Sequence, residues 1–329
     1  MRKQNLSTLL AFLVTIILVS FFLLQINITD LTDGLKQINP VYFIFGFALY
    51  LCSYIFRTCR FYVLLNKEIN FKDLFYVVCI HNLVNNILPA RTGELSYVYI
   101  LNKLHNRSMS EGIASLTVVR FFDFITIFLL FFLSVSQIQI ESQFITNSLC
   151  FITLFMMLVI FLFLTFFFYG NRFISNTRKI LETFGPGNKK SFIYLFSKLE
   201  DVIKSFEKIK SFEKIIFLEL IALSFGAWLS LYLFNYILIK TLNIDLDFLT
   251  VIFSTSFAVF TTVLPIQGIG GFGTLEGGWS AGLIAAGLKS DVAICSAFLF
   301  HIIMIIYFLI LGFLGFLGMK SKRLFKKQS

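Results

Sequence analysis

Seven ionisable side chains lie inside or beside long apolar runs of this chain. A charge at the centre of a membrane helix costs roughly 2.5 to 3.5 kcal/mol on insertion scales, so such side chains are expected to face the protein interior. They are Arg57, Arg60, Arg91, Glu94, Arg120, Asp123 and Glu276. Because four are basic and three acidic, the set is nearly neutral as a whole. We interpret all seven as candidate substrate-binding residues.

The chemistry that these residue types favour is the binding of an anion. The guanidinium of arginine presents a planar fork of donors that suits phosphate. A half-helix beginning at Pro89 would direct unpaired N–H groups and a positive dipole end toward the same region. The acids would balance charge, bind an ammonium group or carry a proton.

A structural role is the alternative for the same residues. Arg91 and Glu94 are three positions apart, as are Arg120 and Asp123, and such pairs lie on one helical face. Both could be ion pairs that only stabilise the fold. The two remaining arginines could mark the end of their helix.

Two stretches interrupt the apolar pattern in a similar way. Residues 85–95 read NNILPARTGEL, and residues 261–278 read TTVLPIQGIGGFGTLEGG. In hydrocarbon, such a break is tolerated only where it is buried in protein or lines a wet cavity. We therefore predict two re-entrant helical hairpins, over 72–104 and 248–288. The residues expected to break the helices are Pro89, Gly93, Pro265, Gly268 and Gly270.

Composition indicates a polytopic membrane protein. The chain has 329 residues, of which 57% are hydrophobic and 14% charged, and its mean hydropathy is +0.84. The predicted fold class is all-α, with six full transmembrane helices and the two hairpins; a plain hydropathy count would report eight or nine spans. The six spans are expected at 7–26, 41–65, 112–136, 145–169, 215–239 and 291–319.

The distribution of basic residues predicts the orientation. With a cytoplasmic N-terminus, the outside segments contain only three basic residues, Lys36, Lys240 and Lys289. The inside segment 170–214 alone contains ten. We therefore predict a protein of the cytoplasmic membrane with both termini in the cytoplasm. The net charge of +10 reflects this pattern and not nucleic-acid binding.

This orientation requires the two hairpins to enter from opposite faces. The prediction is a single transmembrane domain, 1–319, made of inverted repeats over 1–136 and 145–319, followed by a basic tail, 320–329. Within 170–214, apolar residues recur with helical spacing between lysines. This segment is expected to form a cytoplasmic amphipathic helix on anionic headgroups, or a solvated connector.

Several other chemistries find no support in the sequence. Residues 268–273, GIGGFG, match a dinucleotide-binding pattern, but they do not follow a strand. His81 and His301 stand alone on apolar helices, and we interpret them as packing or hydrogen-bonding residues. We predict no catalytic residues, no metal and no cofactor, and no ATP-binding motif is present.

The two breaks and the charges between them resemble a known family. The motifs are Leu88-Pro89-Ala90-Arg91 with Gly93-Glu94, Arg120 with Asp123, and Leu264-Pro265 with Gly268, Gly270 and Glu276. They resemble the transmembrane region of lysylphosphatidylglycerol synthase/flippase, the multiple peptide resistance factor family, over about residues 5–319. The resemblance implies movement of an aminoacylated phosphatidylglycerol to the outer leaflet. In two-domain members, a cytoplasmic synthase domain makes that lipid from aminoacyl-tRNA.

The sequence ends about ten residues after its last predicted span. We therefore expect no synthase domain and no lysyltransferase activity, and we do not assign an enzyme. The expected function is flippase-like translocation of an anionic or aminoacylated phospholipid, either downhill or coupled to an ion. The alternatives are translocation of a polyprenyl-phosphate or glycolipid, a scaffold for a lipid-modifying enzyme or glycosyltransferase, and an enzyme acting on a membrane lipid. The expected partners are the phospholipid and a separate synthase or glycosyltransferase, without nucleic acid.

Overall fold

The chain is helical throughout its described parts. The computed structural model describes residues 20–21, 24, 28–88, 92–135, 143–183, 190–263 and 269–326, and these ranges contain no strand. Within them, five helices are long and apolar enough to cross a membrane. These are α3 (Pro40–Leu64), α6 (Met109–Val135), α7 (Gln143–Thr183), α9 (Lys214–Thr241) and α12 (Ser290–Lys326). Five predicted spans thus coincide with such a helix, and nearly all of the sixth, 7–26, falls outside the described residues.

Both interrupted stretches form pairs of short helices. The first pair is α4 (Phe71–Ile87) with α5 (Glu94–His105), and the second is α10 (Phe248–Val263) with α11 (Thr274–Ala285). The members of each pair pack against each other. The helices therefore end where the proline and glycine pattern predicts. Their depth in a membrane, and so their re-entrant character, stays a prediction.

Local backbone preferences explain the two breaks. Leu88 is extended (φ −79°, ψ 137°), as expected for a residue before proline. The second break contains a short 3-10 turn, η3 (Ile269–Gly271), and its glycines Gly270 and Gly273 adopt φ of 67° and 82°. Such values strain residues with a Cβ. The other predicted breaking residues, Pro89, Pro265 and Gly268, lie outside the described residues.

Gly93 has a different role from the one that the sequence suggested. It begins α5 with ordinary right-handed dihedrals, so the break does not need its conformational freedom. A Cβ at Gly93 would instead overlap the backbone of Asn85 near the end of α4. Glycine is therefore required because the two helices approach each other closely.

The succession of helices in the first half of the chain recurs in the second. A long helix is followed by a six-residue loop, a short helix, a break, a 12-residue helix and another long helix. The loops 65–70 and 242–247 even share a left-handed asparagine, Asn66 (φ 53°) and Asn243 (φ 56°). Packing recurs too, because α4 lies on α12 while α10 lies on α6. The exact boundaries of the two repeats stay a prediction.

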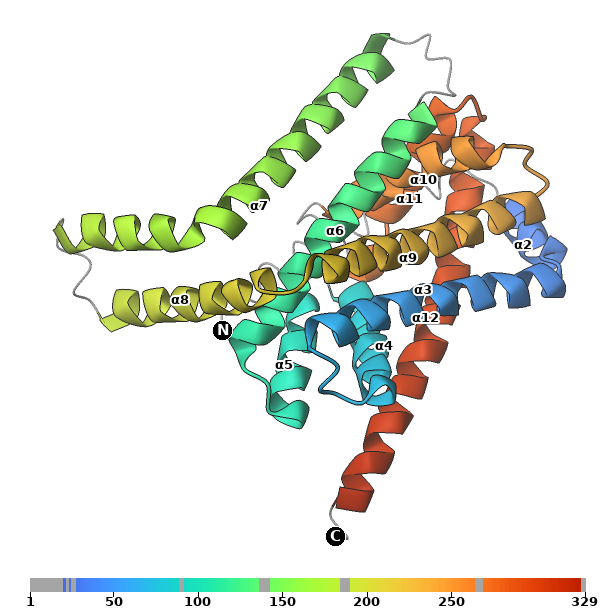
Figure 1. Ribbon diagram of the computed structural model, residues 1–329. Coiled ribbons are helices and arrows are strands. Elements are labelled where there is room, and N and C mark those ends of the chain that lie inside the picture. The colour runs from blue at the N-terminus through green and yellow to red at the C-terminus, as the bar shows by residue number, and fades with distance from the viewer. Residues whose placement is uncertain are drawn as a thin grey trace.

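The two halves meet where α3 packs along α9, side by side in Figure 1. These helices are antiparallel, since Gly46 of α3 approaches Phe234 of α9, whereas Arg60 of α3 reaches Ser224. The loops that follow them consequently lie at opposite ends of the helix pair. The large apolar core extends from this contact into α4, α11 and α12.

The basic segment 170–214 is almost entirely helical. The helix α7 continues to Thr183, and α8 (Lys190–Lys210) runs back beneath its end in Figure 1. Ile203, Phe206 and Ile209 on the apolar face of α8 are buried against α6 and α7. These apolar side chains therefore pack on the protein and are not free to enter a headgroup layer.

Candidate functional site

A buried ion network connects four helices. Arg60 of α3 donates to Asp123 of α6 at 2.5 Å, and these residues are 1% and 4% exposed. Trp228 of α9 donates its indole N–H to the same carboxylate at 2.7 Å. Arg120 binds the second oxygen of Asp123 at 3.4 Å and also Glu94, at the start of α5, at 2.9 Å. The network therefore fixes α3, α5, α6 and α9 relative to one another.

Arg57 differs from the other two arginines in this cluster. Among the described residues, no carboxylate lies within ion-pair distance of it. Its NH1 group donates to the Asn82 side-chain oxygen at 3.3 Å, and its guanidinium lies 5.8 Å from the centre of the Trp228 ring. Its buried Nε–H has no hydrogen-bond partner. Among the described residues of the cluster, three arginines against two carboxylates leave one positive charge (3 − 2 = +1), and Arg57 is the arginine without an ion-pair partner there.

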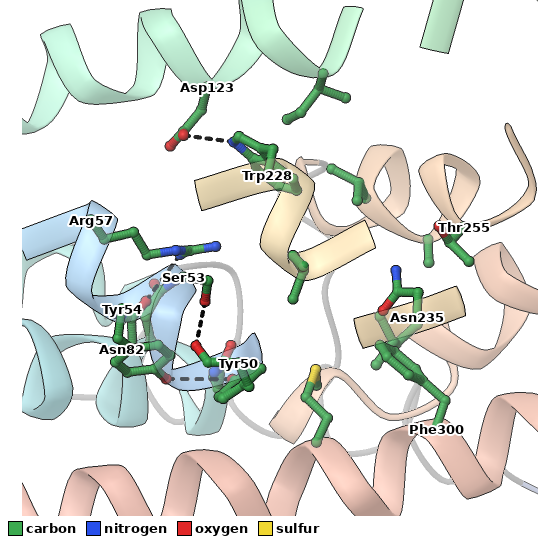
Figure 2. Close-up of a pocket in the computed structure, with 18 of the residues that line it drawn as sticks. Tyr50, Ser53, Tyr54, Arg57, Asn82, Asp123, Trp228, Asn235, Thr255 and Phe300 are labelled. Carbon is green, nitrogen blue, oxygen red and sulfur yellow. Dashed lines mark hydrogen bonds between the residues drawn. The ribbon is translucent and has the colours of Figure 1, made fainter. Parts of the chain in front are cut away.

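A cavity of about 150 Å³ lies beside Arg57, between the two helix pairs. Its wall is rich in amides and hydroxyls, and Figure 2 shows Arg57 extending among them. The polar lining includes Tyr50, Ser53, Tyr54, Asn82, Asn85, Asn86, Asn235 and Thr255. The side-chain oxygens of Asn85 and Asn235 are buried without a hydrogen-bond partner, and Asn235 is only 4% exposed. Unpartnered buried polar groups are rare, so the wall is suited to a polar ligand or water.

The structure does not bring Glu276 to the arginines. Its carboxylate lies 2.6 Å from Nδ1 of His301 on α12, and both side chains are fully buried. The second carboxylate oxygen accepts the Gly273 backbone N–H at 2.7 Å, which caps the start of α11. The His301 ring meets the Gly270 carbonyl oxygen at 2.9 Å through Nε2. The six described members of the predicted set are therefore divided, with Glu276 paired to His301 apart from the arginine cluster.

Three results follow for the sequence-based candidates. Arg57, Arg60, Glu94, Arg120 and Asp123 are brought together, whereas Arg91 lies outside the described residues and is not placed. The interpretation of His301 as a packing or hydrogen-bonding residue is confirmed, but its partner Glu276 and the asparagines of the cavity wall were not predicted. The sequence does indicate that Glu276 needs a polar partner, because an acid in an apolar helix is not stable alone. No spacing rule identifies that partner as His301, 25 residues away (301 − 276). Within the described residues, no group of three metal-ligating side chains occurs.

These features define the class of the protein: an α-helical, multi-pass membrane protein with two broken helix pairs around a polar cavity. The family described as "Lysylphosphatidylglycerol synthase TM region" matches residues 8–312, and the chain belongs to this family. A similar protein is "UPF0104 membrane protein MJ1078" of Methanocaldococcus jannaschii, which is 29% identical over 199 residues. That match covers 59% of this chain and 75% of the relative. No solved structure matches the chain.

Proposed function

We propose that the chain is a flippase-like lipid transporter whose cavity binds the phosphate of an anionic phospholipid. The observation that carries this proposal is Arg57, a half-buried arginine on the cavity wall that has no carboxylate partner among the described residues. Arginine suits phosphate because its planar fork offers several donors at once. Asn82 positions the Arg57 side chain, and the amides around it offer further N–H donors.

Arg60 and Arg120 have a supporting role in this proposal. Arg60 is paired with the buried Asp123, and Arg120 is paired with Glu94 and Asp123, so binding a phosphate through either arginine would weaken an existing ion pair. Removing one partner of a buried ion pair typically costs about 3–5 kcal/mol. The network therefore shapes one wall of the cavity, while Arg57 contacts the ligand.

The charge balance also favours a class of cargo. With one positive charge in excess among its described residues, the cluster attracts a lipid whose headgroup is a simple phosphodiester anion. Lysylphosphatidylglycerol carries a net positive charge, and both described carboxylates of the cluster are engaged by arginines. We therefore favour phosphatidylglycerol over its lysyl derivative, although the family description refers to the latter.

Transport is supported by the arrangement of the helices. Transporters with inverted repeats bind their substrates at the meeting point of two broken helices and expose them alternately to either side. Here both helix pairs contribute to the cavity wall, through Asn82 and Asn85 of the first and Thr255 and Leu275 of the second. A cavity of about 150 Å³ holds a molecule the size of benzene, which suits a headgroup while the acyl chains stay in lipid.

The test is leaflet exchange in proteoliposomes containing fluorescent phosphatidylglycerol, its lysyl derivative or a polyprenyl phosphate. Arg57→Gln should slow exchange about tenfold or more, because a charge-assisted hydrogen bond is worth about 1.5–3 kcal/mol. Arg172→Gln, which removes an exposed arginine of α7, is the matched control and should exchange normally. Equal rates for wild type and Arg57→Gln would contradict the role of Arg57. Faster exchange of polyprenyl phosphate would reassign the cargo, and no exchange of any lipid would favour a scaffold.

A further inference from the structure

The hydrogen bonds around His301 determine how many protons the Glu276–His301 pair holds. The Gly270 carbonyl oxygen can only accept, so Nε2 of the ring must carry a hydrogen to donate at 2.9 Å. The opposite ring nitrogen faces a carboxylate oxygen of Glu276 at 2.6 Å. If neither atom carried a proton, two lone pairs would face each other at hydrogen-bond distance. One further proton must therefore lie between Nδ1 and Oε1, on the ring or on the carboxyl.

We propose that Glu276 and His301 form a proton-binding site that holds residues 269–273, the described part of the second helix break, against α12. When the proton is bound, the pair is neutral overall and His301 fixes the Gly270 carbonyl while Glu276 fixes the Gly273 N–H. When that proton leaves, the single hydrogen left on the His301 ring cannot serve both the Glu276 carboxylate and the Gly270 carbonyl, so one of these two contacts becomes repulsive. The break then separates from α12. A link between this event and lipid exchange rests on the proposed function, whereas proton binding itself does not.

The first helix pair contains a corresponding contact that cannot titrate. Glu94 at the start of α5 binds Arg120 on the following long helix, 26 residues later (120 − 94). Glu276 in the first turn of α11 binds His301 on its following long helix, 25 residues later (301 − 276). Arginine stays protonated at all physiological pH values, whereas histidine is the side chain that changes charge near neutrality. Of these two corresponding contacts, only the one between Glu276 and His301 contains a side chain of the type that changes charge near neutrality.

Few other ionisable groups can influence this pair. The helix α10 has none, and Glu276 is the only one on α11. From α4, Tyr76 and Cys79 contact α12 at Gly318 and Gly315, at least 14 residues from His301 and so about 20 Å along the helix axis. The helix α4 also packs on η3, and its histidine, His81, faces Ser96 of α5. From α3, Tyr50 packs on Tyr307.

On α2 (Ile28–Gln37), Asp33 and Lys36 pair with each other. This helix contacts α12 at Leu299, whose side chain points to a different face from that of His301. Among the described residues, the side chains of Glu276 and His301 hydrogen-bond only to each other and to the backbone of Gly273 and Gly270. Within the part of the chain that the structure describes, no other ionisable side chain hydrogen-bonds to the pair.

The pair lies directly behind the cavity wall. Leu275, next to Glu276, and Phe300, next to His301, both line the cavity. Trp279 of α11 stacks on Phe300, with ring centres 4.0 Å apart. A movement of α11 away from α12 would therefore change the cavity, which gives proton release a direct route to the ligand site.

Glu276→Gln provides the test, because its amide can donate to Nδ1 while its carbonyl accepts from Gly273. This variant should imitate the proton-bound state at every pH. Infrared difference spectra of the protein in lipid nanodiscs, recorded between pH about 5 and 9, should show titrating carboxyl and imidazole bands. Those bands should be lost in Glu276→Gln and in His301→Gln. They should persist in Glu219→Gln, which removes an exposed acid of α9.

Hydrogen exchange of residues 269–274 provides the second readout. After correction for intrinsic rates, exchange in the wild type should accelerate about tenfold or more as pH rises, while Glu276→Gln stays slow. An absence of titrating bands, or the same bands in Glu276→Gln, would overturn the proposal. Titrating bands with no exchange of any lipid would leave the proton site standing and remove the proposed function. Lipid exchange without titrating bands would overturn the proton site and leave the proposed function standing.

Discussion

Asp123 is the residue on which the arginine cluster depends. Its carboxylate accepts hydrogen bonds from Arg60, Arg120 and Trp228, which come from three different helices. Because Arg60 is buried with only Asp123 as its charged partner among the described residues, neither charge is stable alone in this environment. The pair therefore acts as a structural unit that holds the cavity wall in place.

Asp123→Asn tests this role. The neutral amide keeps the shape of the side chain but leaves Arg60 as a buried charge without a counter-ion, so we expect a loss of about 3–5 kcal/mol of stability. Thermal unfolding in detergent, followed by Trp fluorescence, measures the change. Asp33→Asn is the control, since its ion pair with Lys36 is exposed and worth about 1 kcal/mol or less. Equal melting temperatures for Asp123→Asn and the wild type would refute the structural role.

At the level of residues, the sequence identified acids and arginines but not all of their partners. The Arg120–Asp123 contact follows from a spacing of three on one helix and is confirmed. The Arg60–Asp123 contact joins residues 63 positions apart, and only the packing of α3 on α6 creates it. The same reason explains why His301 was interpreted as an isolated residue.

Among the helix pairs, α10 and α11 make an especially close approach. Small residues four apart face each other, Ser254 and Ala258 on α10 and Gly278 and Gly282 on α11. Small residues at this spacing allow helix backbones in a membrane to come together. A Cβ added at Gly282 would overlap the carbonyl group of Ser254, so this helix pair has no room for a larger residue.

Gly282→Ala should therefore destabilise the protein by about 1–3 kcal/mol, the usual range for overpacking. Gly170→Ala in α7 is the control, because the nearest atom to the added Cβ is the terminal methyl of Ile203, at 3.2 Å, and a ring carbon of Phe166 lies at 3.9 Å. That variant should be neutral or more stable by up to about 1 kcal/mol, since alanine favours helix. Thermal unfolding of both variants measures the two changes in stability. A Gly282→Ala variant as stable as the wild type would mean that α10 and α11 can move apart without a loss of stability.

At the level of elements, the breaks could be predicted because proline and glycine act on the backbone locally. Leu88, for example, adopts an extended backbone conformation because the next residue is Pro89. The environment of α8 could not be predicted in the same way. Its apolar spacing at Leu199, Ile203 and Phe206 fits a lipid surface and a protein surface equally well, and only the position of α6 and α7 decides between them.

On the scale of the whole molecule, the orientation of the chain in the membrane depends on the antiparallel contact of α3 and α9. Loops 65–70 and 242–247 have the same length and the same left-handed asparagine, and they follow helices that run in opposite directions. If both helices cross the membrane, the two loops lie on opposite sides. The basic residues predict that 65–70 is cytoplasmic, which would place both termini in the cytoplasm.

The orientation can be tested at Glu68 and Asp245, two exposed residues at equivalent places in these loops. Each lies two residues after the left-handed asparagine of its loop (68 − 66 = 2 and 245 − 243 = 2). Glu68→Cys and Asp245→Cys should react oppositely with a membrane-impermeant maleimide added to intact cells, after subtraction of the wild-type labelling of the native cysteines. Only Asp245→Cys should be labelled from outside, and Glu68→Cys should require permeabilised cells. Labelling of both from outside would show that α3 and α9 do not both span the membrane. The inverted arrangement on which the transport proposal depends would then lose its basis. Labelling of Glu68→Cys alone would keep the inverted arrangement but reverse its direction, which places the basic segment 170–214 outside and contradicts the charge rule.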